Sequence, residues 1–521
     1  MAAALLAAAL VALGHLLGWD GVDTPAQVYR VDSLRHQGFS LWDFRWYGGH
    51  WTLDYSVLYP TLASAVGILT VTVVSAAVAA LAFDRLARAR LGPGGPAAAY
   101  VFAAGTLVAA SIGQLTFLTG EAFGMAAMWA LLAKRRVAAL ILALGCTLTS
   151  PLTGAFLALA GAAWAAERIL DRDPAAGWGL AMAAVCGVPI LGSFLLFPGD
   201  GPMPYPVLDW AWEIVVAAAI GALAGRERRA LSIGVALYMV AATVSVAVPS
   251  ALGGNIGRLE DMVALPLAIA LAWTRLPLLV PVAALPLALS QWGPAWGAMT
   301  AAPASPATHR SFFTPLDRVL SAQGTRGPAG RVEVVPTEWH WEAAWVAPVM
   351  PLARGWERQL DEADNPIFYH PGDLNPRSYR AWLLDNAVRF VALPATPLDM
   401  AGQAEGRLIG SGRVPGLHLV WQSPQWRLYS VLGAPGIVSG PARLVSTVGT
   451  RIELDARGAG QVTVRVRWSP DWYVAAGAGC VSRYQDWMDV RVDRPGPVSL
   501  QLSLFGPDRT GCPAGAVAAG H

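Results

Sequence analysis

The stretch WDGVDTPAQVYRVDSLRHQGFSLWDFRWYGGHWTLDYSVLYP, residues 19–60, decides how this chain is organised. It follows a first apolar segment, precedes a long series of others, and gathers acidic, basic and aromatic side chains in a chain with only 14% charged residues. We call residues 19–56 the opening loop. A chain so poor in charge is expected to carry its chemistry there.

Composition predicts a polytopic membrane protein, because 55% of the 521 residues are hydrophobic. Apolar blocks of spanning length stop near Trp292. We therefore expect an α-helical membrane domain over 1–292, a linker over 293–310, an α+β region over 311–435 and a β-sandwich-like region over 436–521. The net charge is +2 and the arginines are scattered, so no basic face for nucleic acid is expected.

Apolar blocks predict about eleven membrane spans, although several fall short of about 20 residues. With the first at residues 1–17, they lie at 57–83, 97–112, 122–133, 137–148, 152–166, 178–197, 210–224, 230–248, 262–273 and 276–289. Segment 1–17 is compatible with a spanning helix, a signal peptide or a helix from a mis-assigned start. We favour a retained helix, since no cleavage site precedes Trp19.

Basic connectors occur at every second gap between the blocks, as in DRLARAR at 84–90 and RERR at 226–229. The positive-inside rule places these connectors, and the N-terminus, in the cytoplasm. The sequence thus predicts a multi-pass plasma-membrane protein whose opening loop and C-terminal domain are extracytoplasmic.

Within the opening loop, Asp23-Thr24-Pro25, apolar residues three apart and a closing Gly38 predict a short amphipathic helix. Such a helix is expected to lie in the plane of the membrane surface.

The C-terminal part alternates apolar and polar residues between Gly and Pro turns, a pattern typical of strands. Strands are expected at 388–394, 417–421, 426–431, 451–456, 462–468, 487–492 and 498–505. Helical pieces are expected only near 341–360 and 378–387. Cys480 and Cys512 both lie in this part, and an oxidising compartment would permit a disulfide between them.

Two acidic residues directly follow the first apolar segment, Asp20 and Asp23. A partly desolvated carboxylate at the outer membrane surface is able to take a proton from an acceptor hydroxyl. The alternative is structural: Asp23 is well placed to cap the next helix, and Asp20 to be an interfacial charge.

Four side chains are candidates for holding a lipid phosphate: Arg258, Arg30, Arg35 and His50. Arginine binds phosphate with two hydrogen bonds, but interfacial arginines also contact lipid headgroups in any membrane protein. Arg258 stands out because it lies in GGNIGRLED, residues 253–261, together with Asn255 and Glu260.

Further substrate-binding candidates in the opening loop are Trp42, Asp43, Trp46, Tyr47, Asp54 and Tyr55. Aromatic rings stack on sugar rings, yet they also form the aromatic belt expected at a membrane interface.

Nucleotide-dependent, metal-dependent and serine-hydrolase motifs are absent, since the sequence holds no GxGxxG or Walker loop, no metal-spaced Cys/His cluster and no GxSxG. Glu121, Asp209 and Glu213 are expected close to the ends of apolar blocks. Ion-coupled transporters usually need ionisable groups near the middle of the membrane, so this placement argues against transport.

The order of a first span, an aspartate, a surface helix, LWDFRWYGG (41–49) and YSVLYP (55–60) resembles the GT-C superfamily of membrane glycosyltransferases. More closely, the chain is similar to the actinobacterial multispanning proteins named for a 6-pyruvoyl-tetrahydropterin-synthase-related membrane domain. LARGWERQLD (352–361), YRAWLL (379–384) and WSPDW (468–472) share in that resemblance.

The resemblance implies a polyprenyl-phosphate sugar donor and an acidic residue of the first outward loop as the base. Asp23 matches that aspartate best, with Asp20 next. No clear outward DxD-type metal motif is visible, so the resemblance assigns no metal and leaves a divalent cation open as the cofactor. We expect an inverting glycosyltransferase acting on a cell-envelope glycan, lipid or protein among membrane lipids; the alternatives are a non-catalytic envelope scaffold and a lipid or glycan flippase.

Overall fold

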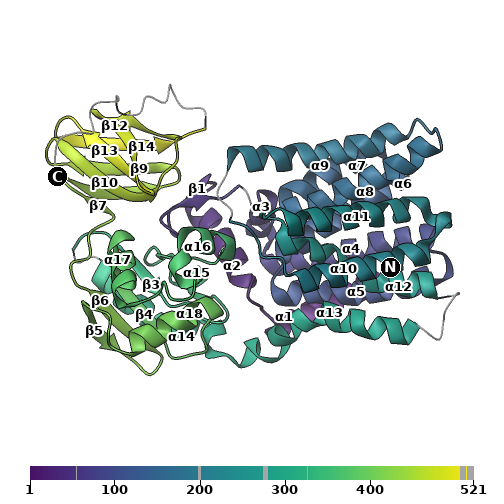
Figure 1. The fold of residues 1–521 in the computed structure, drawn as a ribbon, viewed down its shortest axis with the longest axis horizontal. Coiled ribbons are helices and arrows are strands. Elements are labelled where there is room, and N and C mark those ends of the chain that lie inside the picture. Colours follow the sequence, from purple (N-terminus) through teal and green to yellow (C-terminus); the bar gives the residue numbers. More distant parts are fainter. Residues whose placement is uncertain (54, 198–200, 274–279, 325–326, 505–511, 513–521) are drawn as a thin grey trace. The chain divides into compact units, whose positions relative to one another are not determined.

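A computed structural model describes residues 1–521 except 54, 198–200, 274–279, 325–326, 505–511 and 513–521. The chain forms two compact units (Figure 1). The helical unit comprises Met1–Val31 and Leu53–Ala304, and the β-rich unit comprises Asp32–Thr52 and Ser305–His521. The opening loop is therefore divided: its ends belong to the helical unit, and its middle belongs to the β-rich unit.

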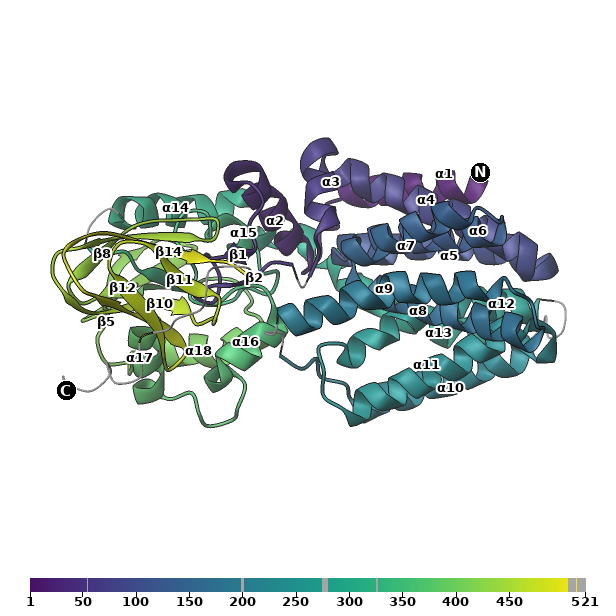
Figure 2. The same ribbon diagram turned by 90° about the horizontal axis from the view of Figure 1, so that it is seen from above.

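Long helices lie side by side in the helical unit (Figures 1 and 2). In chain order they are α1 (Ala2–Leu16), α2 (Thr24–Gln37, which continues into the β-rich unit), α3 (Leu58–Val66), α4 (Ile68–Arg90), α5 (Gly95–Ile112), α6 (Leu115–Leu132), α7 (Arg136–Thr149), α8 (Pro151–Leu170), α9 (Ala176–Leu196), α10 (Val207–Ala224), α11 (Arg229–Ala247), α12 (Arg258–Ala272) and α13 (Val280–Thr300). Short 3₁₀ turns precede α5, α11 and α12 at Gly92–Gly94, Arg226–Arg228 and Gly253–Gly257.

Six helices in the described part of the chain are long and apolar enough to cross a membrane: α4, α5, α6, α9, α10 and α11, the second and last counted with their leading 3₁₀ turns. Each predicted apolar block overlaps a helix, but α1 and α7 are shorter apolar helices. The expected number of about eleven spans is therefore not confirmed. What stands is a helical region with several helices able to span a membrane.

Small residues let the helices approach closely. Alanines dominate the core between α1, α4 and α5, where Phe83 and Phe102 stack with ring centroids 4.1 Å apart. Between α8 and α9, a methyl group on Gly179 would lie 2.7 Å from the carbonyl oxygen of Gly161. In a membrane, burial of apolar surface does not drive helices together, because lipid tails are equally apolar. Helices there associate through close backbone packing at small residues.

The predicted short helix is present as α2, and Gly38 follows it with φ of 77°. Its expected amphipathic pattern is not confirmed, because polar Thr24 and Gln27 are among its buried residues while Val28 is only half-buried. A two-stranded hairpin follows, β1 (Trp42–Asp43) with β2 (His50–Trp51).

The first part of the β-rich unit is an α+β layer. Its sheet has the order β3-β4-β6-β5, with β3 parallel to β4 and the other pairs antiparallel. The strands are β3 (Arg331–Val334), β4 (Val388–Pro394), β5 (Leu417–Gln422) and β6 (Trp426–Val431), and the helices are α14 (Arg310–Gly324), α15 (Glu342–Trp345), α16 (Arg358–Asp364), α17 (Pro376–Asp385) and α18 (Met400–Gly410). One core joins β4 with α17 and α18 through Val391, Trp382 and Ile409, whereas Phe312 of α14 packs on Trp426.

The second part is a sandwich of two four-stranded antiparallel sheets, with orders β12-β13-β10-β7 and β11-β14-β9-β8. Its strands are β7 (Val438–Ser439), β8 (Ala442–Val448), β9 (Arg451–Ala456), β10 (Gly460–Arg467), β11 (Trp472–Ala476), β12 (Gly479–Tyr484), β13 (Trp487–Val492) and β14 (Gly496–Leu502). Alternating burial along β9 and β10 gives each sheet one face in the core. A disulfide joins Cys480 to Cys512, the pair that the sequence suggested.

The predicted linker needs correction at its start. Helix α13 continues to Thr300, so residues 293–300 are helical. Two 3₁₀ turns, Ala302–Ala304 and Pro306–Thr308, then lead to α14, and the boundary between the units falls after Ala304. Helices α14 and α18 also lie outside the helical pieces that the sequence predicted.

Candidate functional site

The first end of the opening loop is anchored to the helical unit. The amide groups of Gly21 and Asp23 donate hydrogen bonds to the carbonyl oxygens of Ser111 and Ile112, at 2.8 and 3.0 Å. Gly113 ends α5 in the left-handed conformation, with φ of 94°, and a methyl group there would lie 2.2 Å from the amide nitrogen of Thr24. This glycine lets the loop lie on the end of α5, which fixes the position of Asp23.

Tyr55, at the other end of the loop, meets residues of α2. The side-chain amide of Gln27 donates a hydrogen bond to the Tyr55 hydroxyl at 3.0 Å. The guanidinium of Arg30 lies over the Tyr55 ring, 3.8 Å from its centroid. Because Gln27 and Arg30 are three residues apart, both side chains reach the same side of the helix.

The Tyr55 hydroxyl also senses charges from two segments of the chain, residues 23–30 and the start of α12. Burial raises the pKa of Tyr55, the charges of Arg30 and Arg258 lower it, and the charge of Asp23 raises it. We call Asp23, Gln27, Arg30, Tyr55 and Arg258 the Tyr55 cluster. The structure thus brings together the best-matching aspartate and two of the predicted phosphate-binding arginines.

Arg258 is the first residue of α12 and lies over the ring of Phe117 on α6, 5.9 Å from the centroid. A cation at this distance from an aromatic face is weakly attracted to it. Asn255, three residues earlier, donates to the carbonyl oxygen of Ala251 at 3.4 Å.

Asp20 and Arg35 lie in other surroundings. Asp20 is half-buried; burial raises its pKa and the charge of His15 lowers it. Arg35 is exposed and follows Arg30 by five residues on α2. Five residues correspond to a rotation of about 140° around a helix axis, so the two arginines point to different sides. Of the two α2 arginines that the sequence offered as alternatives beside Arg258, Arg30 is the one that lies on Tyr55, and a phosphate-binding role of Arg35 stays a prediction.

The middle of the opening loop forms part of the core of the β-rich unit. Trp42, Trp46, Tyr47 and His50 are at most 6% exposed. The Trp46 indole donates to the carbonyl oxygen of Ala343 at 3.2 Å, and the Tyr47 hydroxyl donates to that of Glu357 at 2.9 Å. Rings buried to this degree present no face for stacking, so Trp42, Trp46 and Tyr47 do not fit the predicted substrate-binding role.

His50 and Asp43 are also occupied within the β-rich unit. The imidazole Nε2 of His50 lies 3.7 Å from the carboxylate of Glu357, and the Asp43 carboxylate accepts a hydrogen bond from the amide of Arg45 at 2.9 Å. The contact with Glu357 occupies the imidazole of His50, so this side chain does not fit the predicted role of binding a lipid phosphate. Asp54, the remaining candidate of this loop, lies outside the described residues.

Glu260 belongs to a different group from Arg258. It is 8% exposed and senses the charge of Glu213 on α10. The Glu213 carboxylate accepts hydrogen bonds from the hydroxyls of Tyr205 and Tyr238, the latter at 3.0 Å. The carboxylates of Glu260 and Glu213 therefore form a separate polar group between α10, α11 and α12.

A cavity of about 40 Å³ reaches into the helical unit between α5, α6, α12 and α13. Its polar lining consists of Thr106, Gln114, Glu121, Arg258, Asp261 and Gln291. We call it the polar cavity. Arg258 belongs both to its lining and to the Tyr55 cluster.

Sequence reasoning missed the position of Glu121. It lies six residues after the start of α6, about 9 Å along the helix axis, and is 5% exposed. Glu213 lies equally far into α10. The expectation that these two carboxyls lie close to block ends is wrong, because α6 begins at Leu115 and α10 at Val207, before the predicted blocks that start at residues 122 and 210. The only sequence signal was the presence of a glutamate in an otherwise apolar stretch.

The β-rich unit buries charge in a different way. Arg354, 3% exposed, donates to the carboxylates of Asp361 and Glu405 at distances of 2.6 to 3.1 Å, and its Nη1 lies 3.7 Å from Glu333. Tyr379 also donates to Glu405, at 2.6 Å. Burial raises the pKa of Glu405 to about 7 and that of Glu333 well above its usual value.

His340 lies between two carboxylates of the same unit. Its ring nitrogens are 3.4 Å from Asp399 and 3.5 Å from Glu342. Burial lowers the pKa of His340, but the contacts with Asp399 and Glu342 outweigh burial and raise it to about 9. The imidazole is therefore protonated at neutral pH and serves as a buried cation.

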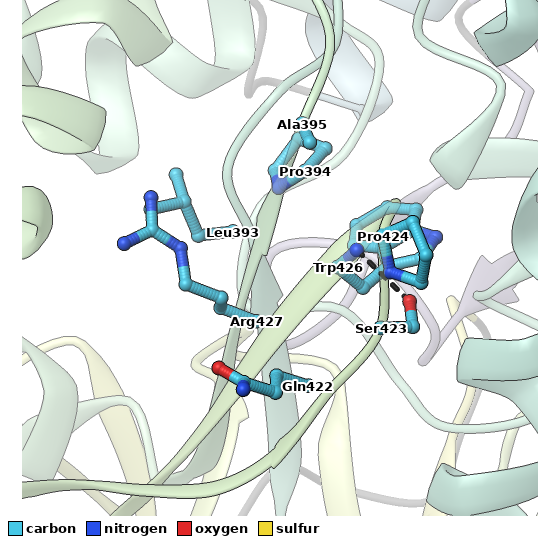
Figure 3. Close-up of a pocket in the computed structure, with 8 residues that line it drawn as sticks. All are labelled: Leu393, Pro394, Ala395, Gln422, Ser423, Pro424, Trp426 and Arg427. Carbon is cyan, nitrogen blue, oxygen red and sulfur yellow. Dashed lines mark hydrogen bonds between the residues drawn. The ribbon is translucent and has the colours of Figure 1, made fainter.

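A second hollow, of about 510 Å³, lies on the β-rich unit where β4 and β5 end and β6 begins (Figure 3). Leu393 and Arg427 lie on one side of it, and Pro424 and Trp426 on the other. The Ser423 hydroxyl holds the hairpin turn by accepting from the Trp426 amide at 3.1 Å. Arg427 is the charged member of this lining.

Within the residues that the structure describes, no group of three or more His, Cys, Asp or Glu side chains is arranged to hold a metal ion. The sequence matches no protein-family model and no curated protein. Function is therefore inferred from the residues and their geometry.

Proposed function

We propose that the chain is a GT-C-type membrane glycosyltransferase that moves a sugar from a polyprenyl phosphate to a cell-envelope glycan, lipid or protein at the Tyr55 cluster. One observation carries the proposal: Asp23 and Arg30, just before α2 and in its middle, and Arg258, at the start of α12, are all close enough to Tyr55 for their charges to shift its pKa, and Arg30 lies on the Tyr55 ring. Several helices able to span a membrane give a polyprenyl chain a suitable environment.

In the proposed reaction, Asp23 is the base. The oxygen of the acceptor hydroxyl bonds to the anomeric carbon of the sugar while the bond from that carbon to the phosphate oxygen breaks. The hydroxyl proton passes to the Asp23 carboxylate, and the bonding electron pair leaves with the polyprenyl phosphate. Attack opposite to the leaving group inverts the anomeric configuration. A base positioned in this way contributes about 10² to 10⁴ in rate.

The two arginines stabilise the leaving group. Negative charge builds up on the phosphate as the glycosidic bond breaks, and fixed guanidinium groups stabilise that charge more than they stabilise the bound donor. Stacking on Tyr55 holds Arg30 in place, and the ring of Phe117 lies beside Arg258.

The β-rich unit is proposed to hold the acceptor. Its 510 Å³ hollow presents the guanidinium of Arg427 and the carboxamide of Gln422, which are paired across β5 and β6. Such groups hydrogen-bond to sugar hydroxyls and to carboxylates of envelope glycans.

The proposal is tested with the full chain in lipid nanodiscs, supplied with polyprenyl phosphates carrying radiolabelled sugars and with a cell-envelope fraction as acceptor. Asp23→Asn is expected to lower turnover by about 100-fold or more, because it removes the base and keeps the shape. Asp20→Asn is the matched control and is expected to keep turnover within about twofold, since its charged neighbour is His15 and it lies outside the Tyr55 cluster. Full turnover by Asp23→Asn would refute the mechanism.

Donor binding is tested separately with polyprenyl monophosphate. Arg258→Gln is expected to weaken its binding about tenfold or more, because a charge-assisted hydrogen bond is worth about 1.5 to 3 kcal/mol. Arg35→Gln is the control, because Arg35 is exposed and turned away from Arg30. Equal losses in both variants would indicate nonspecific attraction of the lipid.

A non-catalytic envelope scaffold is the second candidate. It is favoured by the middle of the opening loop, whose aromatic side chains are structural parts of the β-rich unit. This candidate predicts that no labelled sugar is transferred by the unaltered protein and that Asp23→Asn changes only stability.

A further inference from the structure

The polar cavity holds two buried polar side chains inside the helical unit. Glu121 is 5% exposed and Gln291 is 4% exposed. The side-chain oxygen of Gln291 has no hydrogen-bond partner among the described residues. The side-chain nitrogen of the same amide lies against Gly105, only 2.8 Å from where a methyl group on that residue would be. The amide is thus held in place with its oxygen unsatisfied.

Such groups are costly in a helix that is able to span a membrane. Burying an unpaired polar group costs about 1 to 3 kcal/mol, and an ionised carboxylate costs far more. Glu121 lies within α6, one of the six candidate spans. Ionisable residues at such depth usually mark a site for an ion or proton.

The lining of the polar cavity is exposed at one end and buried at the other. Asp261 is exposed, Arg258 and Gln114 are half-buried, and Glu121 and Gln291 are buried. The cavity therefore leads inwards from the surface of the helical unit. Its volume of about 40 Å³ holds a few water-sized particles and excludes a sugar ring.

Charge and size together define the ligand. With Glu121 and Asp261 ionised and Arg258 protonated, the lining carries one net negative charge. Its other polar atoms include the carboxamide oxygens of Gln114 and Gln291, and oxygen ligands suit hard cations. Because the guanidinium already balances one of the two carboxylates, a monovalent cation neutralises the lining, whereas a divalent cation would leave it with a net positive charge. The described residues likewise contain no three-carboxylate metal group.

We propose that the polar cavity binds a small monovalent cation, H⁺ or Na⁺, at the carboxylate of Glu121. The cation neutralises Glu121, and the free oxygen of Gln291 completes its surroundings. This site goes beyond the proposed transferase reaction and shares only Arg258 with it. The charged groups that line the cavity together with Glu121 are Arg258 and Asp261 on α12, and the thiol of Cys146 on α7 senses the charge of Glu121.

The test uses N,N′-dicyclohexylcarbodiimide on the full chain in lipid nanodiscs. This apolar reagent modifies protonated carboxyl groups in apolar surroundings, and peptide mass spectrometry locates the label. We expect label on Glu121 at low pH in choline chloride. Loss of that label when pH rises, without sodium, identifies a proton site. Loss of label when sodium chloride replaces choline chloride at constant pH identifies a sodium site.

Two variants sharpen the test. Glu121→Gln is expected to abolish the label on that peptide. Gln291→Leu keeps the size of the side chain but removes its oxygen, so sodium protection or the pH at half-labelling is expected to shift several-fold. Should either variant fail to fold, the competition experiment on the unaltered protein decides alone. Absence of label on Glu121 at every pH, or label that responds to neither pH nor sodium, would overturn the proposal.

Discussion

The opening loop is built differently at its ends and in its middle. At its ends, Asp23 lies on the end of α5, and Tyr55 meets Gln27 and Arg30 at the margin of the helical unit. In its middle, Trp46 and Tyr47 are fully buried and hydrogen-bond to backbone carbonyl groups of the β-rich unit. Similar residue types therefore serve as a candidate site in one place and as core in the other.

The same contrast holds for arginines. Arg354 is buried and its donors are hydrogen-bonded to Asp361 and Glu405, so it has nothing to offer a ligand. Arg258 is half-buried and lines a cavity. Burial with satisfied hydrogen bonds indicates a structural role, whereas polar groups around open space indicate a binding role. Each prediction below compares a change in one unit with a change in the other.

The largest effect is expected at Arg354. Arg354→Met leaves the buried carboxylates of Asp361, Glu405 and Glu333 without their cation, which is expected to cost about 3 to 5 kcal/mol of folding free energy. Arg258→Met is the matched change in the helical unit and is expected to cost less than about 1 kcal/mol while weakening donor binding.

Hydrogen–deuterium exchange of the full chain measures both variants, because slowly exchanging amides of β4 report unfolding of the β-rich unit. Fast exchange of β4 in Arg258→Met, or unchanged exchange in Arg354→Met, would contradict the distinction between structural and binding arginines.

A dependence on pH follows from His340. Its pKa is raised to about 9 in the folded protein, above its ordinary value of about 6.5 in the unfolded chain. Its contribution to stability is therefore complete below about pH 6.5 and is lost as pH rises through about 9, a change of about 3 kcal/mol. Urea unfolding at several pH values, followed by near-ultraviolet circular dichroism, measures it. His340→Gln is expected to flatten the dependence of unfolding free energy on pH between about 6.5 and 9. His418 is exposed, and His418→Gln is expected to leave that dependence unchanged.

Local sequence signals were sufficient for part of the fold, although β3, β7, β8, β11 and β12 were not among the predicted strands. The strand patterns in the sequence placed β4, β6, β9 and β13 at their observed bounds, although β4 and β13 are buried along nearly their whole length instead of on one face alone. The cap residues and Gly38 likewise bounded α2. Helices α14 and α18 were missed, and Pro315 inside α14 is one reason, since a proline usually ends a helical pattern.

The candidate site was only half predictable. Asp23, Arg30 and Arg258 were identified from residue type and position, and the structure brings them together. The burial of Trp46 and Tyr47 depends on pairing with residues about 300 positions away, which no local pattern encodes. Gln291 and Glu121 line one cavity because α13 and α6 both pack on α5, an arrangement that is equally invisible in the sequence.

A smaller effect on stability, with a large effect on function, is expected at Gly113. Gly113→Ala places a methyl group 2.2 Å from the amide nitrogen of Thr24 and must displace Asp23 from the end of α5. The cost is about 1 to 3 kcal/mol, with strong loss of sugar transfer. Gly92→Ala is the matched control, since Gly92 also has positive φ, 75°, but open space around it. Equal transfer by both variants would show that the position of Asp23 does not matter.

The smallest effects come from a matched pair of tyrosines. Tyr47→Phe removes a hydroxyl that donates to the carbonyl oxygen of Glu357. Tyr55→Phe removes a hydroxyl that accepts from the side-chain amide of Gln27. Each is expected to cost about 1 kcal/mol in its own unit. Only Tyr55→Phe is expected to raise the KM for the donor several-fold, because loss of the bond to Gln27 loosens the ring on which Arg30 rests. A rise in KM for Tyr47→Phe would instead mean that the middle of the loop reaches the substrate, and the division of the loop into core and site would fail.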